Sequence, residues 1–101
     1  MTAARLTAHQ AVEAQTAREI HAAAYARLGR ARRRGFTAAD LTDFSDAMRE
    51  VQARENAMRR RWWPTAVSVQ VGTLGEAVEV LVYPTTDPTD AHLLTLEAAQ
   101  Q

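Results

Sequence analysis

Few residues in this chain are suited to chemistry, and the histidines are the first candidates. His9 and Glu13 stand one helical turn apart, and Asp90 and His92 stand two residues apart. A protein zinc site needs three or four ligands, and neither pair supplies more than two. Cysteine is absent, which removes thiolate ligands, thiolate nucleophiles and disulfides. We therefore expect surface histidines, and we predict no metal site and no cofactor.

Carboxylates and hydroxyls form no catalytic pattern either. Asp40, Asp43 and Asp46 are spaced by three, so they drift around a helix, and capping, the helix dipole and solvation account for them. Ser45 and Ser68 lie outside any nucleophile-elbow sequence, and the four glycines form no phosphate-binding loop. We therefore expect a protein that is not an enzyme.

All twelve basic residues are arginines, and two groups of them are candidate phosphate contacts. The groups are Arg30, Arg32, Arg33 and Arg34, and Arg59, Arg60 and Arg61. Trp62 and Trp63 follow the second group, and arginine beside aromatic rings is typical of nucleic-acid contact. Both groups also lie where helices are expected to end, and a helix C-terminus favours positive charge. Nucleic-acid binding is therefore the alternative function.

Charge and length give further bounds. Residues 1–63 hold twelve arginines and seven acids, a net charge of +5, whereas residues 64–101 hold five acids and no base, a net charge of −5. Such halves attract each other within a chain or between neighbouring chains. We expect one domain over 1–101. No stretch approaches the roughly 18 apolar residues of a membrane span, so we expect a cytoplasmic protein without a membrane partner.

The stretch from Thr37 to Pro64 is the clearest helix. Thr37 followed by Asp40 resembles a capping box, and Pro64 cannot continue a helix. An apolar seam with heptad spacing runs between them and is the predicted interaction surface. Its members are Leu41, Phe44, Met48, Val51, Glu55, Met58 and Trp62. Such a narrow seam packs against another helix, from this chain or a second copy. Glu55 is expected to reach solvent, pair with an arginine of the first helix, or fix register.

An earlier helix is predicted from about Thr7 to Arg34, where alanine, glutamine, glutamate and arginine are common. Its apolar face is marked by Val12, Ile20, Ala24 and Leu28. Gly35 is a suitable helix stop, and the turn before Thr37 is short. The two helices are therefore expected to form an antiparallel hairpin over about 7–63. Residues 1–6 are expected to be loose.

Period-two alternation begins after Pro64. Residues 65–71 and 76–83 are rich in valine and predict a β-hairpin over about 65–83. We expect Gly72 to Gly75 to form the loop, with Val71 opposite Glu76, which places the valines on one face. That face needs a cover, and the helical hairpin is the nearest candidate.

The last segment begins at Asp87 and Pro88, which predict a short helix over about 88–100. His92, Leu94 and Leu96 alternate, so a third strand is the alternative. The predicted fold is thus α+β: a long antiparallel helical hairpin, a two-stranded β-hairpin and a short C-terminal helix. From residue 38 onward this order resembles that of small head–tail joining proteins of phages, through the order of elements alone.

The leading hypothesis for function is a non-catalytic interaction or assembly subunit. It self-associates through the seam of helix 41–62 or through the β-hairpin edges, as a homo-oligomer or within a larger assembly. The alternative is a nucleic-acid-binding module that uses the arginines at 30–34 and 59–61. The two hypotheses differ in whether nucleic acid accompanies the protein at low salt.

Overall fold

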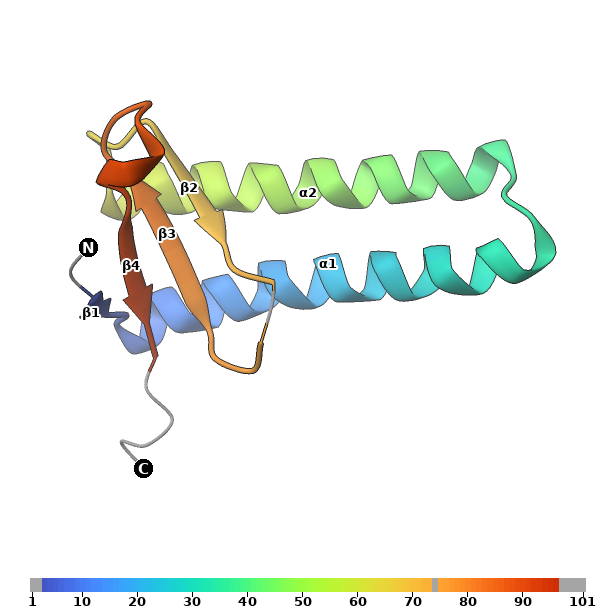
Figure 1. The fold of residues 1–101 in the computed structure, drawn as a ribbon, viewed down its shortest axis with the longest axis horizontal. Coiled ribbons are helices and arrows are strands. Elements are labelled where there is room, and N and C mark those ends of the chain that lie inside the picture. Colours follow the sequence, from blue (N-terminus) through green and yellow to red (C-terminus); the bar gives the residue numbers. More distant parts are fainter. Residues whose placement is uncertain (1–2, 74, 97–101) are drawn as a thin grey trace.

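The computed structural model describes residues 3–73 and 75–96, and these residues form an α+β fold (Figure 1). Two long helices, α1 (Ala8–Arg34) and α2 (Ala38–Trp62), form an antiparallel hairpin. The strands are β1 (Ala3–Arg5), β2 (Ser68–Val71), β3 (Glu79–Tyr83) and β4 (His92–Thr95), with a 3-10 helix at Pro88–Asp90. The predicted α+β class, helical hairpin and β-hairpin are confirmed.

Threonine caps begin both helices. Thr7 Oγ1 accepts the Gln10 N–H at 3.1 Å, and Gln10 Oε1 accepts the Thr7 N–H at 2.9 Å. Thr37 and Asp40 exchange the same two bonds at 3.2 and 2.9 Å, so the predicted capping box is confirmed. Gly35 ends α1 with φ at 90°, a left-handed backbone that favours glycine.

Alanines bring the two helices together. Ala14, Ala17, Ala24 and Ala31 recur along α1 at helical spacing and are all at most 2% exposed, and α1 packs along α2. Val12 is 61% exposed, so the apolar face predicted for α1 was wrong there. The prediction fails at Val12 because the close packing of two helices selects small side chains. Ala24 is the residue of that prediction that the contact buries.

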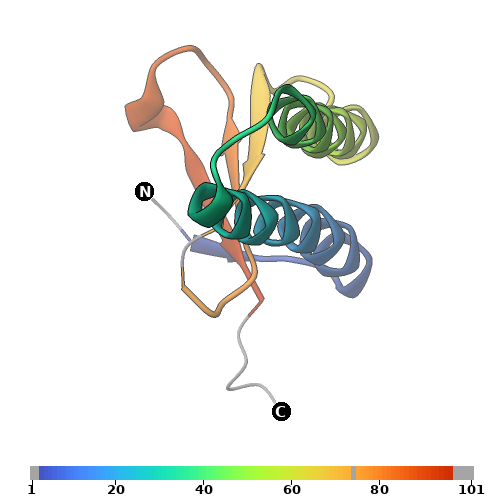
Figure 2. The same cartoon turned by 90° about the vertical axis from the view of Figure 1, so that its right-hand side faces the viewer.

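The sheet has the strand order β1-β4-β3-β2, with β1 parallel to β4 and the other neighbours antiparallel. Figure 2, which looks along the helices, shows both helices on one side of it. The face toward the helices carries the buried side chains Val69, Val71, Val80, Val82 and Leu94. The helical hairpin therefore covers the valine face, as predicted.

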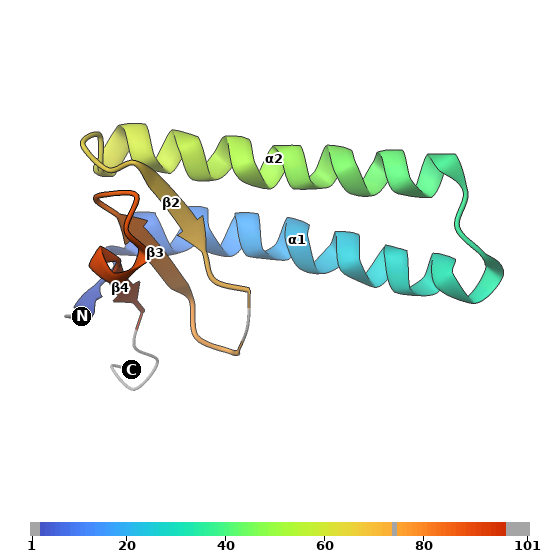
Figure 3. The same cartoon turned by 45° about the horizontal axis from the view of Figure 1, so that its top comes forward.

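The sheet covers only part of the hairpin. The helix residues that belong to the core with the sheet all fall within 11–20 and 51–62. Figures 1 and 3 show α1 and α2 continuing well beyond the sheet to their connecting turn. We call residues 8–20 and 51–62 the proximal half of the hairpin, and residues 21–50 the distal half. The proximal half belongs to a helix–sheet core, whereas the distal half is one helix on another.

The predicted register of the β-hairpin was wrong. Val71 pairs with Val80 and Val69 with Val82, so the loop extends from Gly72 to Val78. The pairing moved by four residues along β3, and an even shift keeps every side chain on its face. Arg18 of α1 explains the longer loop, because its guanidinium donates to the carbonyls of residues 75, 76 and 77. Those carbonyls are thus held by α1 instead of by β2.

The predicted C-terminal helix was wrong over its described part. Asp87 caps as expected and accepts the Thr89 N–H at 2.9 Å, but only the short 3-10 helix follows. Strand β4 then pairs with β3 and buries Leu94, so the alternating pattern decides the structure. Residues 97–100 of the prediction lie outside the described residues. Without that helix, the order of elements no longer supports the resemblance to head–tail joining proteins.

The segment expected to be loose is part of the sheet over its described residues. Strand β1 runs parallel to β4, and the Leu6 N–H donates to the Thr95 carbonyl at 2.9 Å. Leu6 is buried in the core. Residues 1–2 lie outside the described residues. The N-terminal segment therefore forms one edge of the sheet, beside β4.

Candidate interaction surface

The structure divides the predicted seam of α2 into two parts. Val51 and Met58, in the proximal half, are buried in the core, and Trp62 packs against it. Leu41, in the distal half, is 55% exposed, and Phe44 and Met48 are half-buried. The seam is thus core at one end and surface at the other. Only the exposed part is available to a partner.

Heptad spacing shows which way the distal side chains point. Arg18 reaches the β2–β3 loop, so Tyr25 and Arg32, seven and fourteen residues later, lie on the same side of α1. Glu55 of α2 contacts β2, so Met48 and Leu41, seven and fourteen residues earlier, also lie on the sheet side. These residues therefore continue the sheet-covered face of the hairpin beyond the end of the sheet.

Aromatic contacts connect the two helices on this face. The rings of Tyr25 and Phe44 meet edge to face with centroids 5.0 Å apart, and the His21 ring lies 4.6 Å from Tyr25. Tyr25 is nevertheless 51% exposed. We call this surface the distal face. It consists of His21, Tyr25, Leu41, Phe44 and Met48.

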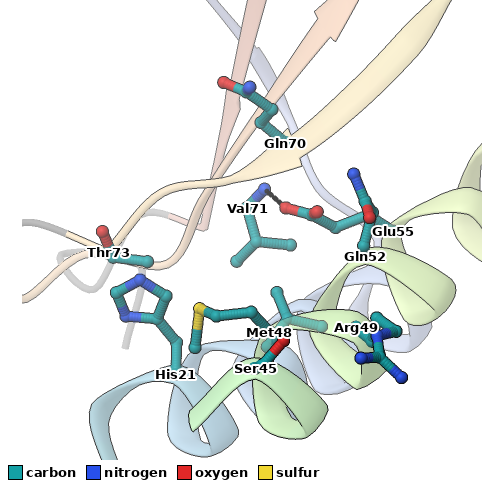
Figure 4. A pocket seen from close by; sticks show the side chains of 10 residues that line it. His21, Ser45, Met48, Arg49, Gln52, Glu55, Gln70, Val71 and Thr73 are labelled. Carbon is teal, nitrogen blue, oxygen red and sulfur yellow. Dashed lines mark hydrogen bonds between the residues drawn. The ribbon is translucent and has the colours of Figure 1, made fainter. Parts of the chain in front are cut away.

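A hollow of about 430 Å³ lies where the distal face meets the sheet. His21 and Met48 from the two helices border it together with Thr73, which follows β2 (Figure 4). Because the sheet ends here and the helices continue, the molecule has a step at this place. A partner that covered the distal face would also contact the end of β2.

Glu55 has a role that sequence reasoning missed. Its carboxylate accepts the backbone N–H of Val71 at 2.8 Å, instead of pairing with an arginine of α1 (Figure 4). Burial raises the pKa of Glu55, and the bond from Val71 opposes that rise. Since β2 is an edge strand, the bond occupies an amide that faces away from β3. Glu55 of α2 thus occupies one outward amide of this edge, which is no longer free to pair with a strand of a second copy.

The two arginine groups are not brought together. Arg30, Arg32, Arg33 and Arg34 end α1, whose 27 residues extend about 40 Å, and the other group ends α2 at the opposite end of the hairpin. Arg34 forms an ion pair with Asp40 at 2.8 Å, and Arg59 donates to the Ala66 carbonyl at 3.3 Å. No shared groove therefore links the groups within the described part of the chain.

The tryptophans beside the second group serve the core. Trp62 and Trp63 are half-buried, pack against the core and meet each other at 6.0 Å between ring centroids. The Arg61 guanidinium lies 4.7 Å from the centre of the Trp62 ring, a cation–π contact. Arg60 is exposed. Packing and intramolecular contacts thus account for most of this group.

The histidines are not grouped into a site. His9 lies beside Trp62, His21 beside Tyr25, and His92 is exposed on β4. Within residues 3–73 and 75–96, no three histidine or acidic side chains are close enough together to hold a metal ion. Over the same residues, no helix has the length and apolar character to cross a membrane. Comparisons of the chain with protein-family models, curated proteins and solved structures find no match.

Proposed function

We propose that this protein is a non-catalytic assembly subunit that associates with further copies of itself through the distal face. The exposure of Leu41 and Tyr25, each more than half accessible within one apolar surface, carries the proposal. Contiguous apolar surface of this kind marks interaction sites in proteins. The same helices bury the equivalent surface under the sheet in the proximal half, so the distal half lacks the cover that the proximal half has.

Charge favours a second copy as the cover. The distal end of α1 carries four arginines, whereas residues 64–96 carry Glu76, Glu79, Asp87 and Asp90 and no basic residue. Within one chain the arginine-rich end points away from the sheet (Figure 1). Its attraction to the acidic region is therefore available to a neighbouring copy, and it weakens as salt screens it.

The size of the surface also suits a dimer of modest stability. Residues 19–34 of α1 extend about 24 Å, and two packed helices are about 20 Å wide, so the footprint is on the order of 500 Å². Contact between the end of one hairpin and the sheet of another adds to this area. A standard interface buries roughly 800 Å² per partner, so the footprint alone corresponds to a smaller interface of this kind.

Light scattering after size exclusion tests the proposal across a wide range of protein concentration. We expect the wild type to exceed the monomer mass. Combined Tyr25→Ser and Leu41→Ser substitutions should return it to a monomer with unchanged helix content. Val12→Ser is the matched control, because Val12 is also more than half exposed but lies outside the distal face. It should leave the mass unchanged.

Two results would overturn this assignment. A wild type that stays monomeric at every concentration excludes self-association, and an unchanged mass in the double variant excludes the distal face. Absorbance at 260 and 280 nm should be recorded in the same runs. Nucleic acid that co-elutes at low salt and is lost at high salt would favour the arginine groups as the functional site instead.

A further inference from the structure

We infer that two copies meet around a two-fold axis that crosses α1 beside Tyr25, with their hairpins antiparallel and their distal faces in contact. This inference rests on the proposed self-association and adds its geometry. In a two-fold interface the same surface is used twice, so each residue on one side of the axis meets its counterpart from the other side. The position of the axis therefore determines every contact.

The boundaries of the distal face place the axis. On α1, the sheet-covered part ends at Arg18, which holds the β2–β3 loop, and the helix ends at Arg34. An antiparallel pair covers this stretch completely when the axis lies at its midpoint, residue 26, next to Tyr25. Each hairpin then fits into the step formed by the sheet of the other. On α2, the same axis brings Leu41 of one copy near Met48 of the second.

Gly29 supports close approach of α1 to its copy. Ala22, Tyr25 and Gly29 share the sheet side of α1, at spacings of three and four. A Cβ at Gly29 would meet nothing within 4 Å, so no contact within the chain requires a glycine there. Glycine lowers helix stability at such a position. An axis between Tyr25 and Ala26 places Ala22 of one copy against Gly29 of the other, where the missing side chain allows the helices to approach.

The same axis pairs opposite charges. Arg32 lies seven residues after Tyr25 and therefore points toward the second copy. There it meets the loop over residues 75–77, where the side chain of Glu76 is exposed. The local cation, Arg18, is turned toward the loop carbonyls of its own chain. Each dimer thus gains two symmetric Arg32–Glu76 contacts between copies.

Disulfide trapping tests this arrangement, because the chain contains no cysteine of its own. A variant with both Ala22→Cys and Gly29→Cys should form a covalent dimer on mild oxidation, since a disulfide forms only when the two Cα atoms lie within about 7 Å. Ala23→Cys with Arg30→Cys is the matched control: the same spacing on the opposite, exposed side of α1. It should remain uncrosslinked. The mass of each reduced variant is measured first, to establish that it still pairs.

A charge exchange provides a second test that needs no cysteine. Arg32→Glu and Glu76→Arg should each weaken dimerisation roughly tenfold, and combining them in one chain should restore it. Arg30→Glu, the same change on the opposite side of α1, should have little effect. If the wild type dimerises but the exchange fails to restore binding and the 22/29 pair does not crosslink, the arrangement is wrong while self-association stands. If the wild type is monomeric, the proposed function itself fails.

Discussion

The two halves of the helical hairpin share one architecture but differ in what covers them. Ala14 and Ala17 in the proximal half and Ala24 and Ala31 in the distal half are all at most 2% exposed, and α1 packs against α2. The helix–helix contact therefore continues along the whole hairpin. Only the sheet, which covers one side of the two helices, stops at the middle of the hairpin. Close helix packing alone therefore leaves a wide apolar side of this hairpin uncovered.

Two methionines ten residues apart on α2 test whether the two halves differ in packing. Met58 is 2% exposed and lies in the helix–sheet core, whereas Met48 is half-buried at the edge of the distal face. Met58→Ala should lower the free energy of unfolding by about 2–5 kcal/mol, because it leaves a cavity. Met48→Ala should lower it much less in the monomer. Urea unfolding at a concentration where the chain is monomeric measures both changes.

Two other outcomes would change this interpretation of the two halves. Equal losses from the two methionine substitutions would mean that the distal half is as well packed as the proximal half. A Met48→Ala loss that grows with protein concentration would instead show that association covers Met48, since an oligomer links stability to concentration. The Met58→Ala loss should not change with concentration.

Local signals predicted much of the fold. Thr7, Thr37, Gly35 and Pro64 set the helix ends by capping chemistry and backbone restriction, which act within a few residues. Valine alternation predicted β2 and β3 and their buried face. The register was wrong because Arg18, more than fifty residues earlier in the sequence, holds the loop carbonyls. Strand β1 was missed because its pairing with β4 joins the two ends of the chain.

The sequence predicted the apolar seam of α2, but not its division into a buried and an exposed part. Heptad spacing placed Leu41, Phe44 and Met48 on one apolar line with Val51 and Met58. It could not say where the sheet would end, because strand length and the position of the sheet depend on tertiary contacts. Tyr25 was missed altogether, since the α1 pattern was read from Val12. The heptad spacing from Arg18 to Tyr25 becomes informative only once the structure shows that Arg18 contacts the β2–β3 loop.

Glu55 lies near the boundary between the two halves, and its substitution should cause the second largest loss of stability. Glu55→Ala removes the acceptor of the Val71 N–H and should cost about 1 kcal/mol of stability. Glu55→Gln keeps a carbonyl acceptor and removes the charge, so its effect depends on pH. Hydrogen exchange at the Val71 amide should increase in the alanine variant and change less in the glutamine variant.

The pH dependence of Glu55 has a definite sign. Burial raises the pKa of its carboxyl above the ordinary value of 4.5, so the folded chain holds this proton more tightly than the unfolded chain. Its contribution to stability is therefore largest below pH 4.5 and is lost as pH rises through the raised pKa. Urea unfolding from below pH 4.5 to neutral pH should show this decline in the wild type and lack it in Glu55→Gln. A decline of equal size in both chains would assign it to other groups.

The two capping boxes provide the mildest contrast between the halves, because one is neutral and the other ionised. The Arg34 side chain, together with the Thr37 N–H, lowers the pKa of Asp40 from 3.8 to about 2, whereas Gln10 fills the same position in the proximal box and does not titrate. The stability that Asp40 adds is present above pH 3.8 and is lost as pH falls toward 2. Hydrogen exchange in the first turn of α2, corrected for its intrinsic pH dependence, should therefore accelerate over that range, and the first turn of α1 should not respond. Asp40→Asn keeps an acceptor for the Thr37 N–H and should abolish the response; if the acceleration persists in this variant, acid loosens the distal half through a group other than its cap.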